Sequence, residues 1–130
     1  MTDDEFIRAF ESCTLPEAMF HHRDHLRLAW LYLGRHGRDG ARVRIAKSIL
    51  RYAASLGKAE KYHHTITLAW LKLVEHAVHR APHANFETLL AAHPYLLDKT
   101  ALEAHYSSSL LGSESSRQTF VEPDLTPLPA

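Results

Sequence analysis

The stretch HHRDHLRLAWLYL, residues 21–33, joins a cluster of three histidines to a helical apolar pattern. With a rotation of about 100° per residue, Leu26, Ala29 and Leu33 fall on one side of a helix, and the arginines fall on the opposite side. The stretch therefore predicts an amphipathic α-helix whose leucine side is buried. Histidine is a weak helix former and a costly core residue, so a cluster at the start of this helix requires an explanation.

Capping signals and helix breakers predict an all-α fold with helices along most of the chain. TDDE (residues 2–5) and TLPE (residues 14–17) have the spacing of capping boxes. The glycines of RHGRDG (residues 35–40) end the helix with the histidine cluster, and Pro82 ends a later one. The predicted helices cover approximately residues 3–12, 14–36, 40–56, 60–80, 85–93 and 97–106.

Two more core helices are predicted after the one that contains the histidine cluster. HLRLAWLYL in that first helix and TLAWLKLV in a later one resemble each other as two core helices, in which Trp30 and Trp70 are packing residues. The helix after RHGRDG has an apolar stripe at helical spacing. Its predicted core residues are Val43, Ala46, Ile49, Leu50 and Ala53.

The composition from residue 107 onward becomes rich in serine and then in proline. The prolines of residues 123–129 exclude a regular helix there, and the apolar residues around them suit an extended strap that packs on the helices. We therefore expect one domain over residues 1–130. Residues 1–106 are predicted to form a compact bundle of four main helices with short C-terminal helices, and residues 107–130 the strap.

Composition limits the partners and the location of the protein. Lysine and arginine total 15, as do aspartate and glutamate, so the basic excess that attracts proteins to nucleic acid is absent. No apolar run approaches the roughly 20 residues of a membrane span, so we expect no membrane partner. Cys13 is the only cysteine, which excludes an internal disulfide, and the acidic N-terminus lacks a secretory signal. These features predict a cytoplasmic protein.

Three histidines are predicted to face the interior near the starts of two helices. His22 and His25 lie three residues apart on the leucine side, and His63 lies with the apolar side of the helix at 60–80. Each unpaired polar group on a buried imidazole would cost about 1–3 kcal/mol. One divalent transition metal (zinc, iron, nickel or copper) would satisfy all three rings and leave a coordination position open. A buried hydrogen-bond network and a surface position for the cluster are the alternatives.

Several neighbouring side chains are candidates to complete this site. Tyr62 and Thr67 flank His63 and are the candidate catalytic groups, because they are able to donate protons or orient a ligand. His21 and His25 have the spacing of zinc-protease helices, but the glutamate of H-E-x-x-H is absent, which excludes a protease. The candidates for additional ligands are Glu17, Glu60, His21, His64 and His105.

Four sequence blocks, FHHRDHLRLAW, KYHHTITLAW, HYSSSLL and RQTFVEPDLTPLP, occur in this order. In these blocks the chain resembles a family of small, all-helical, functionally uncharacterised bacterial proteins. An acidic residue follows the second-block histidine in many members, whereas this chain has His64, so the resemblance does not support a carboxylate there. The terminal P-D-L-x-P-L-P implies an ordered tail. The family patterns F-x-H-x-x-H and Y-H-x-T-I-T correspond here to Phe20, His22, His25, Tyr62, His63, Thr65, Ile66 and Thr67.

The leading hypothesis from the sequence is a small metal-dependent enzyme. In it, His22, His25 and His63 hold one metal ion that acts on a small-molecule substrate through metal-bound water. The alternative is a non-enzymatic helical module that binds or senses a small ligand through a buried histidine network. A structural or partner-binding helical protein is the third hypothesis.

Overall fold

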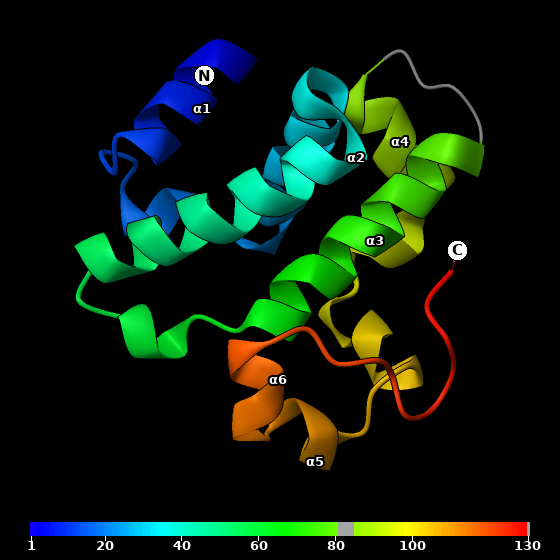
Figure 1. Ribbon diagram of the computed structural model, residues 1–130. Coiled ribbons are helices and arrows are strands. Elements are labelled where there is room, and N and C mark those ends of the chain that lie inside the picture. The colour runs from blue at the N-terminus through cyan, green and yellow to red at the C-terminus, as the bar shows by residue number, and fades with distance from the viewer. Residues whose placement is uncertain (81–84, 130) are drawn as a thin grey trace. The chain divides into compact units, whose positions relative to one another are not determined.

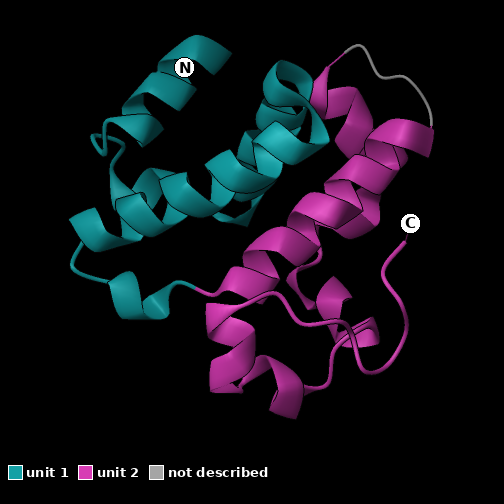
Figure 2. Ribbon diagram, in the orientation of Figure 1, with its two compact units in different colours: residues 1–62 teal, residues 63–130 magenta. Residues whose placement is uncertain are grey.

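The computed structural model describes residues 1–80 and 85–129, and all regular structure in these ranges is helical (Figure 1). This confirms the all-α prediction. The chain divides into two compact units, residues 1–62 and residues 63–130 (Figure 2). In the described part of the chain, no helix combines the length and apolar character needed to cross a membrane.

The first unit begins with α1 (Asp3–Glu11), which starts as the sequence predicts. Thr2 and Glu5 form a complete capping box, with each side chain accepting the backbone N–H of the other. One face of α1 buries Phe6 and Phe10. The TLPE signal, by contrast, does not open a helix. It leads only into a single 3₁₀ turn, η1 (Glu17–Met19), and the next α-helix begins eight residues later than predicted, at residue 22.

The hydrogen-bonded run α2 (His22–Ser55) consists of two helices that meet at Gly37. Gly37 has φ +72°, a left-handed conformation that favours glycine. The Tyr32 hydroxyl lies 3.1 Å from the Ser48 hydroxyl, 16 residues further along the chain. A straight helix would separate these positions by about 24 Å, so the chain reverses direction near Gly37. The predicted break within RHGRDG is therefore confirmed.

The second half of α2 buries a different face from the predicted one. Val43 is 61% exposed and Leu50 is 43% exposed, so the predicted stripe of this helix is wrong at both positions. The physical reason is that tyrosine and serine occupy the inner face and have buried hydrogen-bond partners there, which an apolar count does not register. The buried residues are Ala41, Ile45, Ser48 and Tyr52.

Aromatic rings fill the core of the first unit. The rings of Phe10 and Phe20 stack with centroids 4.8 Å apart, and that of Tyr52 lies 4.7 Å from Phe10. The Tyr52 hydroxyl donates to the backbone oxygen of Leu15 at 2.8 Å. These contacts join α1, the loop after it and the second half of α2 into one core.

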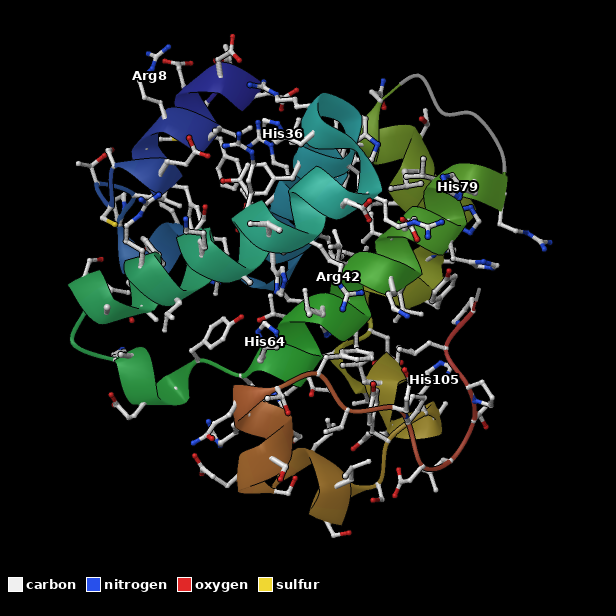
Figure 3. The ribbon with its side chains drawn as sticks, viewed as in Figure 1. Arg8, His36, Arg42, His64, His79 and His105 are labelled. Atoms are coloured by element: carbon white, nitrogen blue, oxygen red, sulfur yellow. The ribbon has the colours of Figure 1, made fainter. Side chains whose placement is uncertain are left out.

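The second unit is built on α3 (His64–Arg80), which begins four residues later than predicted. Residues around 60 form a separate 3₁₀ turn, η2 (Ala59–Lys61), at the end of the first unit. Figure 3 shows His64 and His79 at opposite ends of α3. Trp70 is buried in this helix, as predicted.

Short helices follow α3. The capping box of Asn85 and Thr88 opens α4 (Phe86–Ala92) at the predicted place, and the segment predicted as a sixth helix contains the 3₁₀ helix η4. Two further short helices lie in residues 108–118, so the predicted extended strap does not begin at residue 107. The remaining elements are η3 (Pro94–Leu97), η4 (Lys99–Ala104), α5 (Ser108–Leu111) and α6 (Glu114–Gln118).

The extended segment 119–129 is the strap, and it is attached to the second unit by hydrogen bonds. The Thr65 hydroxyl donates to the Thr119 oxygen at 2.9 Å and accepts from the Val121 N–H at 3.1 Å. The Leu125 N–H donates to the backbone oxygen of His105 at 3.0 Å. The strap is thus an ordered element of this unit, as the sequence predicts.

Candidate functional site

His63 precedes the first residue of α3 and serves as its cap. Its Nδ1 accepts the backbone N–H of Ile66 at 3.1 Å, and its Nε2 lies 2.7 Å from the backbone oxygen of Leu111. These contacts define the neutral tautomer in which Nδ1 accepts and Nε2–H donates. Both ring nitrogens of His63 are therefore engaged within the second unit.

A cavity of about 580 Å³ lies in the second unit, with His63 in its wall. Its volume is in the range of pockets that hold small organic ligands. The wall combines residues from α3, η4, α5, α6 and the strap, so three of the four sequence blocks contribute to it. The lining residues are His63, Ile66, Glu103, Tyr106, Ser107, Ser108, Leu111, Gly112, Arg117 and Leu125.

Two polar residues of the cavity wall attach the strap. The buried Tyr106 donates its hydroxyl to the Val121 oxygen at 2.8 Å, and burial raises the pKa of this phenol to about 12. Ser107 donates its hydroxyl and its backbone N–H to the two carboxylate oxygens of Asp124, at 2.6 and 2.8 Å. These two donors hold the pKa of Asp124 below its ordinary value.

His105, next to Tyr106, also belongs to this attachment. Its Nδ1 lies 2.9 Å from the backbone oxygen of Thr126, and the ring lies beside the C-terminal segment (Figure 3). This contact gives His105 a role in positioning the strap. The sequence hypothesis that it completes the histidine site stays a prediction.

A different histidine environment occurs in the first unit, at the start of α2. The Nε2 atom of His25 is buried and has no hydrogen-bond partner among the described residues. Burial, together with a smaller effect of the nearby His22, lowers the pKa of this imidazole to about 4. The Phe20 ring lies 6.4 Å from the His25 ring. His25 therefore has an open nitrogen lone pair or N–H in an apolar setting.

The three predicted metal ligands are divided between the two units, with His22 and His25 in the first and His63 in the second. No group of three or more His, Cys, Asp or Glu side chains arranged to hold a metal ion occurs within residues 1–80 and 85–129. The three-histidine site stays a prediction. To ligate a metal through Nε2, His63 would have to release the Leu111 oxygen.

Other predicted residues have local roles in the structure. Glu17 forms an ion pair with Lys58 at 2.5 Å. Thr67 donates its hydroxyl to the backbone oxygen of His63, four residues earlier, at 2.9 Å. Exposed or half-buried positions are occupied by His21, Glu60, Tyr62 and His64.

The sequence analysis did not identify the cavity wall. Ser107, Ser113 and Asp98 cap short helices through their side chains, and capping of this kind is readable from sequence. The contact of Ser107 with Asp124 spans 17 residues and has no local signal. The only sequence signal for it is that both residues lie in the blocks HYSSSLL and RQTFVEPDLTPLP.

No known protein family, curated protein or solved structure matches this chain.

Proposed function

We propose that this chain is a helical module that binds a small organic molecule in the cavity of its second unit. The observation that carries the proposal is the cavity of about 580 Å³ lined by both polar and apolar side chains. Ligand sites in proteins combine an apolar surface with a few placed polar groups, and this wall has that composition.

The way in which the cavity is built supports the same function. Tyr106 and Ser107 each combine a place in the wall with hydrogen bonds to the strap, so the wall has defined side-chain positions. Fixed positions reduce the entropy cost of binding a ligand, because fewer groups become ordered on association. The strap also contributes Leu125 to the wall.

A pair of tryptophan substitutions tests this proposal. Ser108 lines the cavity at the first position of α5, so Ser108→Trp fills the space without removing a cap. Ser115→Trp places the same ring on an exposed position of α6 that is not in the wall. A thermal-shift screen of small amines, acids and amides is expected to find compounds that stabilise the wild type and Ser115→Trp but not Ser108→Trp. Equal responses from all three proteins would refute cavity binding.

The buried Nε2 of His25 favours a metal-dependent function as a second candidate. His22 lies close enough to His25 to affect its pKa, and two imidazoles three residues apart on a helix are able to share one ion. A transition metal bound by these two imidazoles would supply a Lewis acid.

Metal content tests this second candidate. Protein purified without a histidine tag is analysed by elemental mass spectrometry before and after EDTA treatment, together with a melting curve. The expected result is about one equivalent of one transition metal in the wild type and none in His25→Leu. His79→Gln, which alters an exposed histidine outside the candidate ligands, is the control and keeps the metal. Wild-type protein that neither contains nor takes up metal would exclude this candidate.

A further inference from the structure

The second half of α2 has an apolar stripe on the side opposite its buried residues. The stripe consists of Val43, Ala46, Leu50 and Ala53, four of the five positions that the sequence pattern assigned to the core. Val43 and Leu50 are exposed, and the two alanines are half-buried. The stripe therefore leaves two large apolar side chains on the surface of this helix.

These four positions, which we call the seam, have the spacing of a contact between two helices. They are separated by three, four and three residues, and at about 100° per residue they occupy only about 80° of the helix circumference. A narrow stripe with this spacing is typical of paired helices, whereas a helix that packs on a globular core has a wider apolar face. The alanines let a partner helix approach closely.

Basic side chains flank the seam. Arg44, Lys47 and Arg51 are exposed and lie along one edge of it, and residues 40–59 contain no acidic side chain. The side chains of Arg44 and Lys47 form no hydrogen bond or ion pair within the described part of the chain. Charged residues beside a helix seam set the choice of partner, because they pair with opposite charges across it. The flank therefore favours an acidic partner.

We propose that the seam binds an acidic amphipathic helix of another protein, whose apolar side chains cover Val43 and Leu50. A second copy of this chain is a poorer partner, because its basic flank would meet that of the first copy. A membrane surface is also a poorer match, since helices that lie in a lipid interface bury a wide apolar face. The seam belongs to the first unit, so the inference does not depend on the cavity of the second unit.

Three labelled peptides test the inference by fluorescence anisotropy with the 130-residue chain. The first peptide is three repeats of Glu-Ile-Ala-Ala-Leu-Glu-Lys, in which glutamates flank an apolar seam. The second exchanges its glutamates and lysines, and the third has the residues of the first in scrambled order. Exposed ion pairs each contribute up to about fivefold in affinity, so the second peptide is expected to bind about tenfold more weakly than the first. The scrambled peptide, which lacks the seam, should also bind about tenfold more weakly.

Two variants locate the binding on the seam. Leu50→Ser is expected to weaken binding of the first peptide about tenfold, because the burial of a leucine side chain is lost. Lys47→Glu reverses one flanking charge and should weaken the first peptide up to about fivefold while strengthening the second. Met19→Ser and Arg8→Glu make the same kinds of change at exposed positions of η1 and α1 and should retain wild-type affinities. Circular dichroism confirms that each variant is folded.

The preference for the first peptide decides the inference. Tighter binding of this peptide that both Leu50→Ser and Lys47→Glu weaken would support it. Equal affinity for the first two peptides, no binding of the first, or wild-type affinity in Leu50→Ser would overturn it. Vesicles of phosphatidylglycerol and a DNA duplex are titrated in parallel. Binding of either one without binding of the first peptide would assign the surface to that partner and overturn the acidic helix.

Discussion

Each unit has a histidine near the start of a helix, but the hydrogen bonding of the two imidazole rings differs. In the first unit, His25 has a buried Nε2 without a partner and a pKa lowered to about 4. In the second unit, His63 caps α3 with one nitrogen and donates to the Leu111 oxygen with the other. Position on a helix therefore does not determine what a histidine does, because the bonds of its two nitrogens decide its contribution.

The surroundings explain this difference. The core around Phe10, Phe20 and Tyr52 packs aromatic rings and offers His25 no polar partner. The second unit, with its short helices and extended strap, is joined by side-chain hydrogen bonds to the backbone. A buried polar group without a partner costs stability, whereas a bonded one contributes to it.

The largest expected effect concerns the pH dependence caused by His25. Its pKa falls from 6.5 to about 4 on folding, so between these values the unfolded chain binds more protons than the folded protein. Stability is therefore full above pH 6.5 and is lost on acidification toward pH 4. The loss due to this residue is about 3 kcal/mol. Urea unfolding with EDTA at pH 7.5, 6, 5 and 4 measures it.

His25→Leu is the matched variant for this measurement. It should be at least as stable as the wild type at pH 7.5 and lack this part of the acid sensitivity. His21→Gln should keep the wild-type pH dependence, because His21 is exposed. An unchanged pH profile in His25→Leu would show that His25 is not buried in the neutral form.

The next effect concerns Thr65, which is fully buried and bonds the strap twice. Thr65→Val keeps the shape but leaves the Thr119 oxygen and the Val121 N–H without this partner, at an expected cost of about 2–3 kcal/mol. Thr67→Val removes one local bond from an equally buried position and should cost about 1 kcal/mol. Urea unfolding measures both. Equal losses would contradict a special role for Thr65 in holding the strap.

His63 should show an effect opposite in sign to that of His25 at neutral pH. His63→Leu removes the helix cap and the donor to Leu111, and should lower the free energy of unfolding by about 1–2 kcal/mol. His63→Asn retains an oxygen that is able to cap α3 and should recover part of this loss. If His63→Leu is as stable as the wild type, the contrast between the two histidines fails.

The smallest effect concerns Asp124, whose carboxylate is exposed. Asp124→Asn weakens the two bonds from Ser107 and should increase amide hydrogen exchange at Ser107 and Leu125 with little change in global stability. In the wild type, these bonds persist above the ordinary carboxyl pKa and are lost as the pH falls through the lowered pKa. Glu122→Gln is the control, and equal exchange in both variants would contradict the role of Asp124.

Local sequence signals predicted the elements that depend on local chemistry. The capping boxes at Thr2 and Asn85 and the break at Gly37 are confirmed, because each is determined within a few residues. The start of α3 was misplaced by four residues, since histidine is not a favoured cap. That shift changes His63 from a residue within a helix to the residue before it.

The sequence could not predict which residues form the wall of the cavity, and the reason is physical. Glu103, Ser108 and Arg117 come from separate short helices, and their common wall depends on contacts far apart along the chain. Apolar periodicity identifies buried faces, but it carries no information about which polar groups meet across a fold. For the same reason, the apolar stripe at Val43 and Leu50 was assigned to the core, although both side chains are exposed.

The bond between Thr65 and Thr119 has a consequence for biosynthesis. These residues are 54 positions apart, so a ribosome that has made α3 still has most of the second unit to translate before this bond is able to form. The ring contacts of Phe10 with Phe20 and Tyr52, in contrast, join residues within 1–62 of the first unit. Domains generally fold as units during synthesis, N-terminal first. Nascent chains stalled before residue 119 should therefore expose the apolar side of α3 to chaperones.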